Sequence, residues 1–192
     1  YGTSGERILL WFDLVNAGES RVPMGSSVPF EGTPKFRVRA AGAFEQLPGC
    51  PAAVEDALGS ERIERICAGE CYNPSDERRR ITRIEVVRIG RQMQESESVA
   101  ELIEDPWLTI PCPADAEVCE VEFEDPWFAS AEREVVYYVR AIQEPTEAVN
   151  AAGLRCSGEQ CEPCYGDYRV PFDDDCLSLT EERAWSSPIY LH

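Results

Sequence analysis

Hydrophobic and polar residues alternate with a period of two along much of this chain. Between residues 35 and 41, charged residues separate Phe36, Val38 and Ala40, so a strand there buries one face and exposes the other. The same signal predicts six strands, at residues 7–14, 35–41, 81–89, 117–123, 134–142 and 187–191. The pattern of 81–89 is mixed in phase, which predicts burial on both faces or a bulge. The residues predicted to face the core in the first, second and fourth stretches are Ile8, Leu10, Phe12, Leu14, Phe36, Val38, Ala40, Cys119, Val121 and Phe123.

One stretch predicts helix instead. It consists of two short segments, 51–58 and 61–67, with Ser60 as the N-cap of the second. Several short strands with turn residues between them are typical of an all-β fold. We therefore expect a single domain over residues 1–192, an immunoglobulin-like or fibronectin-III-like β-sandwich with a short helical insertion (about 43–80) and a long, disulfide-stapled connection (about 144–184). In such a sandwich, a tyrosine of the stretch 134–142 is expected to close a corner onto nearby backbone.

The formal net charge of −18 limits the partners that this chain can have. So acidic a surface repels nucleic-acid phosphates and anionic membrane, so we expect no nucleic-acid partner and no membrane insertion. The sequence contains no apolar run of membrane-spanning length and no signal peptide. It also opens directly on a predicted strand, which favours a fragment of a longer or processed protein.

Nine cysteines point to an oxidising compartment, periplasmic or extracellular. An odd number leaves one thiol over, and we expect this to be Cys67 on the helix face. The predicted disulfides are Cys112 with Cys119, Cys164 with Cys176, Cys156 with Cys161, and Cys50 with Cys71. A four-thiolate zinc site is the alternative for the last part of the chain, formed by Cys156, Cys161, Cys164 and Cys176.

The sequence carries no complete catalytic centre. The only histidine, His192, stands at the end of the chain, whereas hydrolytic metal sites and serine or cysteine nucleophiles need histidine at their centre. No glycine-rich phosphate loop is present. We therefore predict no catalytic residue, no enzyme activity for this chain and no cofactor. Grouped carboxylates suit one structural calcium ion, for which the candidate ligands are Asp167, Asp173, Asp174 and Asp175, although a solvated turn explains them more simply.

The four-residue word EDPW occurs twice, at 104–107 and at 124–127. One interpretation is a pair of tryptophans, Trp107 and Trp127, that form an aromatic platform for a sugar or a peptide. The other is that each Asp-Pro begins a turn and each tryptophan covers an edge of the core, which is the commoner use of the residue.

Longer words in this sequence resemble one protein family. They are 1–8 (YGTSGERI), 70–76 (ECYNPSD), 81–89 (ITRIEVVRI), 137–145 (YYVRAIQEP), 163–169 (PCYGDYR) and 181–189 (EERAWSSPI). In this order they resemble the C-terminal part of the bacterial domain-of-unknown-function 3604 family, whose longer members are similar to PHP-type (polymerase and histidinol phosphatase) metal hydrolases. The resemblance covers essentially all 192 residues. It implies that the family's metal ligands lie upstream, so it assigns no catalytic or metal residue here, and it implies export.

Three functions follow as hypotheses. The first is a non-catalytic C-terminal module of an exported PHP-like hydrolase of unknown substrate, with the upstream hydrolase part of the same protein as its partner. The second is a free-standing extracellular binding or structural module with a glycan or protein partner. The third is a zinc or redox domain. The sequence does not determine an oligomeric state.

Overall fold

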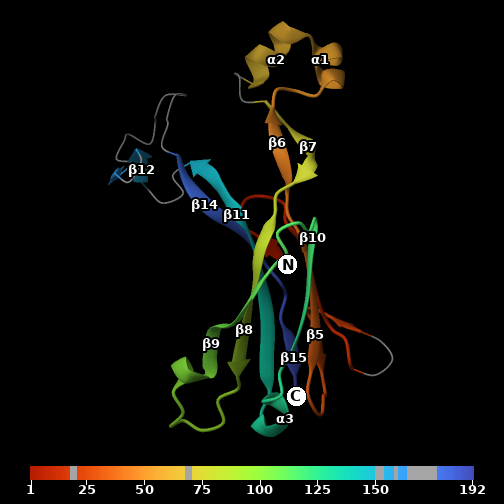
Figure 1. Ribbon diagram of the computed structural model, residues 1–192, viewed down its shortest axis with the longest axis vertical. Coiled ribbons are helices and arrows are strands. Elements are labelled where there is room, and N and C mark those ends of the chain that lie inside the picture. Colours follow the sequence, from red (N-terminus) through yellow and green to blue (C-terminus); the bar gives the residue numbers. More distant parts are fainter. Residues whose placement is uncertain (18–20, 68–70, 150–153, 158–159, 164–176) are drawn as a thin grey trace.

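The structure is a computed structural model that describes residues 1–17, 21–67, 71–149, 154–157, 160–163 and 177–192. Strands make up most of it, as the alternating sequence pattern predicts (Figure 1). Two main sheets form the body of the molecule, and two small two-stranded sheets lie outside it. Among the described residues no helix is both long and apolar enough to cross a membrane.

The smaller main sheet has the strand order β10-β5-β2-β3. Its centre is β5 (Lys35–Ala41), which pairs antiparallel with β2 (Leu9–Leu14) on one side and with β10 (Val118–Glu124) on the other. The short β3 (Val22–Pro23) extends the sheet beyond β2. On the solvent face, cross-strand neighbours carry opposite charges: Arg37 Nη2 lies 2.7 Å from a carboxylate oxygen of Glu122.

The larger sheet is built around β11 (Val135–Val149). On one side β11 pairs with β8 (Ile81–Gly90), which in turn pairs with β9 (Ile103–Pro111). On the other side it pairs first with β15 (Ile189–Leu191) and farther along with β14 (Leu177–Trp185). Two short strands complete the sheet, β1 (Gly2–Thr3) beside β14 and β4 (Ser27–Val28) beside β15.

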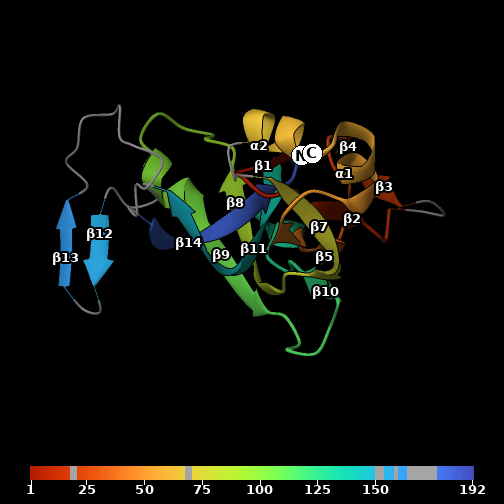
Figure 2. The same cartoon turned by 90° about the horizontal axis from the view of Figure 1, so that it is seen from above.

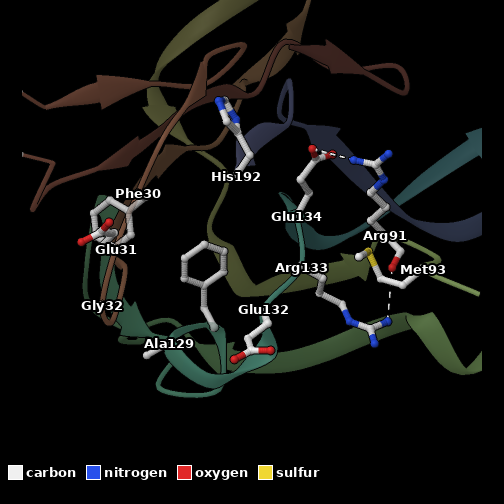
Figure 3. A pocket seen from close by; sticks show the side chains of 11 residues that line it. Phe30, Glu31, Gly32, Arg91, Met93, Ala129, Glu132, Arg133, Glu134 and His192 are labelled. Carbon is white, nitrogen blue, oxygen red and sulfur yellow. Dashed lines mark hydrogen bonds and ion pairs between the residues drawn. The ribbon is translucent and has the colours of Figure 1, made fainter.

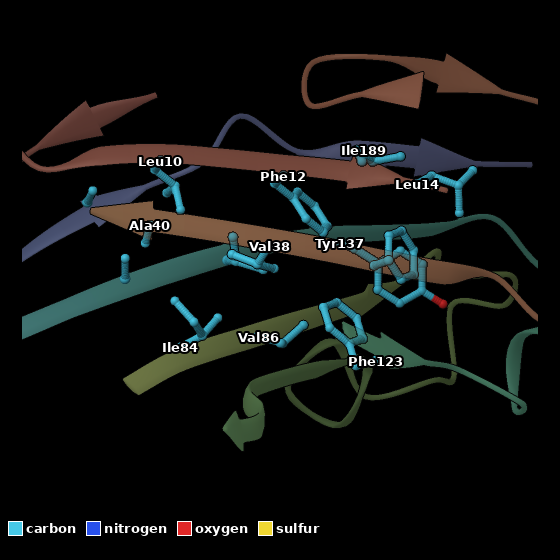
Figure 4. Close-up of a cluster of buried hydrophobic side chains, with 14 of the residues drawn as sticks. Leu10, Phe12, Leu14, Val38, Ala40, Ile84, Val86, Phe123, Tyr137 and Ile189 are labelled. Carbon is cyan, nitrogen blue, oxygen red and sulfur yellow. The ribbon is translucent and has the colours of Figure 1, made fainter. Parts of the chain in front are cut away.

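The two sheets face each other across one hydrophobic core (Figure 4). Phe12, Phe36 and Phe123 of the smaller sheet stack with ring centroids 4.9–6.3 Å apart, and Tyr137 of β11 meets Phe36 at 4.7 Å from the other side. Of the residues predicted from the alternation to face the core, all are buried except Val121, which is half-buried. The predicted irregularity of residues 81–89 is also confirmed, because the register of β8 shifts against both of its neighbours.

The predicted helical insertion forms an arm that extends from the body (Figure 1). The arm consists of β6 (Phe44–Pro48), α1 (Ala52–Leu58), α2 (Ser60–Cys67) and β7 (Tyr72–Arg78), with β6 and β7 paired antiparallel. The two helices agree with the two predicted segments, except that Ser60, predicted as the N-cap of the second, is the first residue of α2. Neither helix contains a buried residue, so neither belongs to the core.

The prediction of one long loop over residues 144–184 is wrong at both ends. β11 continues to Val149, and β14 begins at Leu177 and pairs with this extension as far as Trp185. Between these strands, β12 (Leu154–Ser157) and β13 (Gln160–Pro163) form a separate hairpin, set apart from the main sheets when seen from above (Figure 2). The boundary at residue 43, by contrast, falls where β6 leaves the body.

The disulfide between Cys112 and Cys119 joins the end of β9 to β10, with the two Cα atoms 5.5 Å apart. Closing a short loop restricts the unfolded chain, which stabilises the native state by about 2 kcal/mol. We expect the double variant Cys112→Ala, Cys119→Ala to lose this amount in urea unfolding. Cys67→Ala is the control, because Cys67 has no disulfide partner among the described residues. Equal stability of the two variants would show that the bridge contributes nothing.

Candidate functional site

The two EDPW words converge on one side chain, Arg88 of β8. From the first word, on β9, Glu104 accepts a hydrogen bond from Arg88 Nε at 2.5 Å. From the second word, just after β10, both carboxylate oxygens of Asp125 lie 2.9 Å from Arg88 Nη1. The guanidinium carbon lies 4.3 Å from the ring centroid of Trp107 and 4.5 Å from that of Trp127. We call these five residues, together with Tyr137, the Arg88 cluster.

Asp125 is the hub of this cluster. Its carboxylate is only 1% exposed, and the side chain of Arg88 is 11% exposed, so the ion pair is shielded from water. Besides Arg88, the Tyr137 hydroxyl donates to Asp125 at 2.7 Å and the Trp127 amide N–H donates at 3.0 Å. A buried carboxylate with four accepted hydrogen bonds is fully satisfied, and this arrangement therefore joins β8, β10 and β11.

The structure bears on three interpretations of the sequence. Trp107 and Trp127 both direct a ring at the internal Arg88, so the tryptophans serve the fold, and only Trp127 stays largely exposed, at 41%. The expected turn at Asp105-Pro106 is wrong, because both residues lie within β9, whereas Asp125-Pro126 does lead through a turn into α3 (Phe128–Ala131). Tyr137 closes onto the Asp125 carboxylate and not, as expected of a corner tyrosine, onto backbone.

The environment of the cluster raises the pKa values of two of its side chains, Arg88 and Tyr137. Burial disfavours the charged guanidinium, but the hydrogen bonds that it donates to Glu104 and Asp125, together with their negative charges, outweigh this effect, and the pKa of Arg88 is raised. Burial, followed by the hydrogen bond to Asp125 and the negative charge of that carboxylate, raises the pKa of Tyr137 far above its ordinary value near 10.

This shift predicts sensitivity to alkaline pH. Because the pKa of Tyr137 is higher in the folded than in the unfolded chain, its contribution to stability is complete below about pH 10 and is lost as pH rises above that value, by at most about 1.4 kcal/mol per pH unit. We expect Tyr137→Phe to remove this dependence, at a cost of about 1–3 kcal/mol at neutral pH for the lost hydrogen bond to the charged Asp125 carboxylate, which keeps its bonds to Arg88. Urea unfolding between neutral pH and pH 11 measures both effects, and an unchanged alkaline slope in the variant would contradict the assignment.

A cleft of about 450 Å³ opens at the α3 end of the molecule, and we call it the His192 cleft (Figure 3). Aromatic, acidic and basic groups share its wall: it is lined by Phe30, Glu31, Gly32, Arg91, Met93, Phe128, Ala129, Glu132, Arg133, Glu134 and His192. A neighbouring hollow of about 520 Å³ shares Arg91, Glu134 and His192 with it. Both are of the size of small-molecule sites.

Ion pairs hold the charged rim of the His192 cleft in place. Arg91 donates to Glu134 at 2.7 Å, and Arg133 donates to Glu97 at 2.8 Å. The backbone N–H of Met93, then Arg133 and the N–H of Gln94, lower the pKa of Glu97. Glu132 occupies the left-handed region with φ of 47°, which is uncommon for a residue other than glycine and places its side chain on the cleft. The cleft therefore combines a fixed polar rim with the aromatic surface of Phe30 and Phe128.

His192 does not form a hydrolytic constellation with its neighbours in the described part of the chain. Its Nδ1 lies 3.5 Å from the Ser27 hydroxyl, at the outer limit of hydrogen bonding. Activating a serine requires a base that a third group orients, and no described side chain bonds to the other ring nitrogen of His192. The size and the lining of the cleft suit a small polar or aromatic ligand.

The structure brings some of the predicted cysteines together. Cys50 and Cys71 are disulfide-bonded with Cα atoms 5.3 Å apart, and Cys112 and Cys119 form the bridge described above. Cys156 and Cys161 are directly opposite each other in the backbone register of the β12–β13 hairpin. Cys164 and Cys176, as well as the calcium candidates Asp167, Asp173, Asp174 and Asp175, lie outside the described residues.

Comparison with protein-family models, with curated proteins and with solved structures returns no match. The function must therefore be argued from the molecule itself. Sequence reasoning missed the Arg88 cluster and the His192 cleft. The repeated EDPW word was a signal for the first, but nothing near Arg88 marks it as the residue on which both words converge. The second combines residues from four separate parts of the chain.

Proposed function

We propose that this chain is a non-catalytic module of an exported PHP-like metal-dependent hydrolase, located after the catalytic part and packed against it. The substrate of that hydrolase is unknown. In this proposal the module is a β-sandwich of the immunoglobulin or fibronectin-III type, and the upstream hydrolase part of the same protein is its partner. The words shared with the domain-of-unknown-function 3604 family suggest the identity of the partner.

The arm carries this proposal, because it presents apolar surface that the module does not bury. Leu47 is 47% exposed, Ile66 is 59% exposed and Tyr72 is 62% exposed, and the two helices bury no residue of their own. An amphipathic helix in a globular protein normally covers its apolar side with a neighbouring element. Exposed apolar residues concentrated on one projecting element are typical of an interaction site. A surface of the hydrolase part is the occupant that we propose for it.

Three further properties agree with this proposal. The two disulfides among the described residues indicate an oxidising environment, which supports a periplasmic or extracellular location. The net charge of −18 supports a protein partner over nucleic acid or anionic membrane. Two sheets that share one core, with β8 and β11 at the centre of the larger one, support the immunoglobulin-like interpretation.

The gene provides the first test. We expect the reading frame upstream of Tyr1 to encode a segment rich in histidine and aspartate, and its absence would end this proposal. Where the segment is present, co-expression of the two parts as separate chains tests the docking. We expect Ile66→Asp to abolish their co-purification. Val99→Asp is the matched control, since Val99 is an equally exposed aliphatic residue outside the arm, and it should leave the complex intact.

The His192 cleft favours a second candidate, a free-standing extracellular module that binds a glycan or a protein. A glycan array and a pull-down with the isolated chain test it. Binding that His192→Ala removes, but that the exposed Trp11→Ala on β2 retains, would support this function. A chain that binds nothing and has a native start immediately upstream would count against both this candidate and the first.

A further inference from the structure

Three sulfur atoms meet in the arm. Cys50 follows β6, Cys67 is the last residue of α2, and Cys71 precedes β7. The disulfide joins Cys50 to Cys71, and Cys67 has no disulfide partner among the described residues. The Cys67 sulfur nevertheless lies 3.8 Å from that of Cys50, and all three sulfur atoms are within 4.8 Å of one another. A thiol is thus in van der Waals contact with a disulfide.

The surroundings make this contact accessible and adaptable. The three cysteines line a cavity of about 540 Å³, which Glu55 and Glu64 also border. Because α1 and α2 bury no residue, the end of α2 can shift without opening a hydrophobic core. New bond formation needs the Cys67 sulfur to turn to the far side of Cys50 and to approach from 3.8 Å to about 2.0 Å.

We propose that Cys50, Cys67 and Cys71 form a thiol–disulfide exchange centre. The Cys67 thiol loses its proton to solvent, and the thiolate attacks the Cys50 sulfur. A bond forms between Cys67 and Cys50, and the bond between Cys50 and Cys71 breaks. Cys71 leaves as a thiolate and takes up a proton, so that no net oxidation occurs and no external oxidant or reductant is required.

The two disulfides hold the arm differently. The bond between Cys50 and Cys71 ties together the chain ends from which β6 and β7 run, next to the hydrogen bond from the Gly49 N–H to the Cys71 carbonyl at 2.6 Å. The bond between Cys50 and Cys67 closes only the two helices and leaves Cys71 as a free thiol beside β7. Exchange therefore gives the arm two covalent forms, with the reactive thiol on the helix or next to the strand. This inference does not depend on the docking proposed above.

Peptide mapping without reductant tests the exchange, because Glu70 allows a protease to cut between Cys67 and Cys71. The whole chain is held at about pH 8.5, where ordinary thiols ionise, then acidified, alkylated and digested after glutamate. We expect Cys50 to be linked to the 71–77 peptide in one fraction and to the 65–70 peptide in another. Alkylation of Cys71 should rise as alkylation of Cys67 falls, one for one. The Cys112–Cys119 bridge serves as the internal control and should not change.

Two variants keep the proposal falsifiable. Cys67→Ser removes the attacking sulfur and should leave Cys50 linked to Cys71 alone, with Cys71 never alkylated. Cys71→Ser should form the bond between Cys50 and Cys67 in air, with neither cysteine alkylated. The proposal is overturned if alkylation marks only Cys67 in the unmodified chain at every time point. It is equally overturned if both thiols stay free in Cys71→Ser, or if Cys67 is found linked to a cysteine outside the arm.

Discussion

Asp125→Ala is expected to destabilise the protein by about 3–5 kcal/mol, because it removes the buried one of the two carboxylates that pair with the charge of Arg88. The Tyr137 hydroxyl and the Trp127 amide lose their acceptor in the same step. The free energy of unfolding of a domain is about 5–15 kcal/mol, so a loss of this size would leave the variant only marginally stable. Urea unfolding followed by circular dichroism and tryptophan fluorescence measures the loss.

The neighbouring carboxylate Glu124 provides a matched control. It is exposed and forms only a 3.8 Å ion pair with Lys35, so Glu124→Ala should change the stability by less than about 1 kcal/mol. The double variant Arg88→Met, Asp125→Leu separates the cost of an unpaired charge from the value of the pair. Replacing both partners by apolar side chains should recover much of the loss. An Asp125→Ala protein as stable as Glu124→Ala would refute the hub role of Asp125.

The alternating pattern identifies most clearly those strands of which one face meets the core and the other meets solvent. β2, β5 and β10 were predicted because their inward residues alternate with outward ones, as Phe36 and Val38 do between charged neighbours in β5. β9 lies at the edge of its sheet and buries no residue fully, and Pro106 in its middle is a turn signal. Without a buried face there is no period of two to detect.

The extended ribbon of β11 and β14 was missed for a different reason. Thr146 pairs with Thr180, and Glu147 pairs with Leu179, so each strand finds its partner more than thirty residues away along the chain. Such pairing depends on where the two strands leave the body of the molecule. A short stretch of sequence contains no information about that position. Leu179, which is strongly exposed, carries no information about a core.

The candidate sites show how little a sequence word determines by itself. The same four residues, EDPW, form part of a strand at 104–107 and a turn before α3 at 124–127. The first word contributes Glu104 to Arg88, at its first position, and the second contributes Asp125, at its second. Only the tryptophans have equivalent roles. The disulfide pairs were more predictable. Cys112 and Cys119 are close in the sequence, and the turn between α1 and α2 brings Cys71 back to Cys50.

The second large effect is expected at Gly42, which connects the body to the arm between β5 and β6. A Cβ atom at this position would lie 1.8 Å from the backbone oxygen of Arg79 and 2.7 Å from its carbonyl carbon, so the two backbone segments must move apart. The movement would disturb the hydrogen bond from the Ala43 N–H to the fully buried Gln143, at 3.0 Å. It would also disturb the one from the Arg79 N–H to the Ala43 carbonyl, at 2.8 Å.

Gly42→Ala should therefore cost about 3 kcal/mol or more, since a buried amide left without its partner alone costs about 1–3 kcal/mol. Gly2→Ala is the matched control, because a Cβ atom there meets nothing within 4 Å, and it should stay within about 0.5 kcal/mol of the unmodified chain. Hydrogen exchange shows which part of the structure is destabilised. Amides of β6 and β7 should lose more protection than those of β2, because the strain lies at the base of the arm. Equal stability of the two alanine variants would show that the backbone at Gly42 can move away from Arg79 without loss of stability.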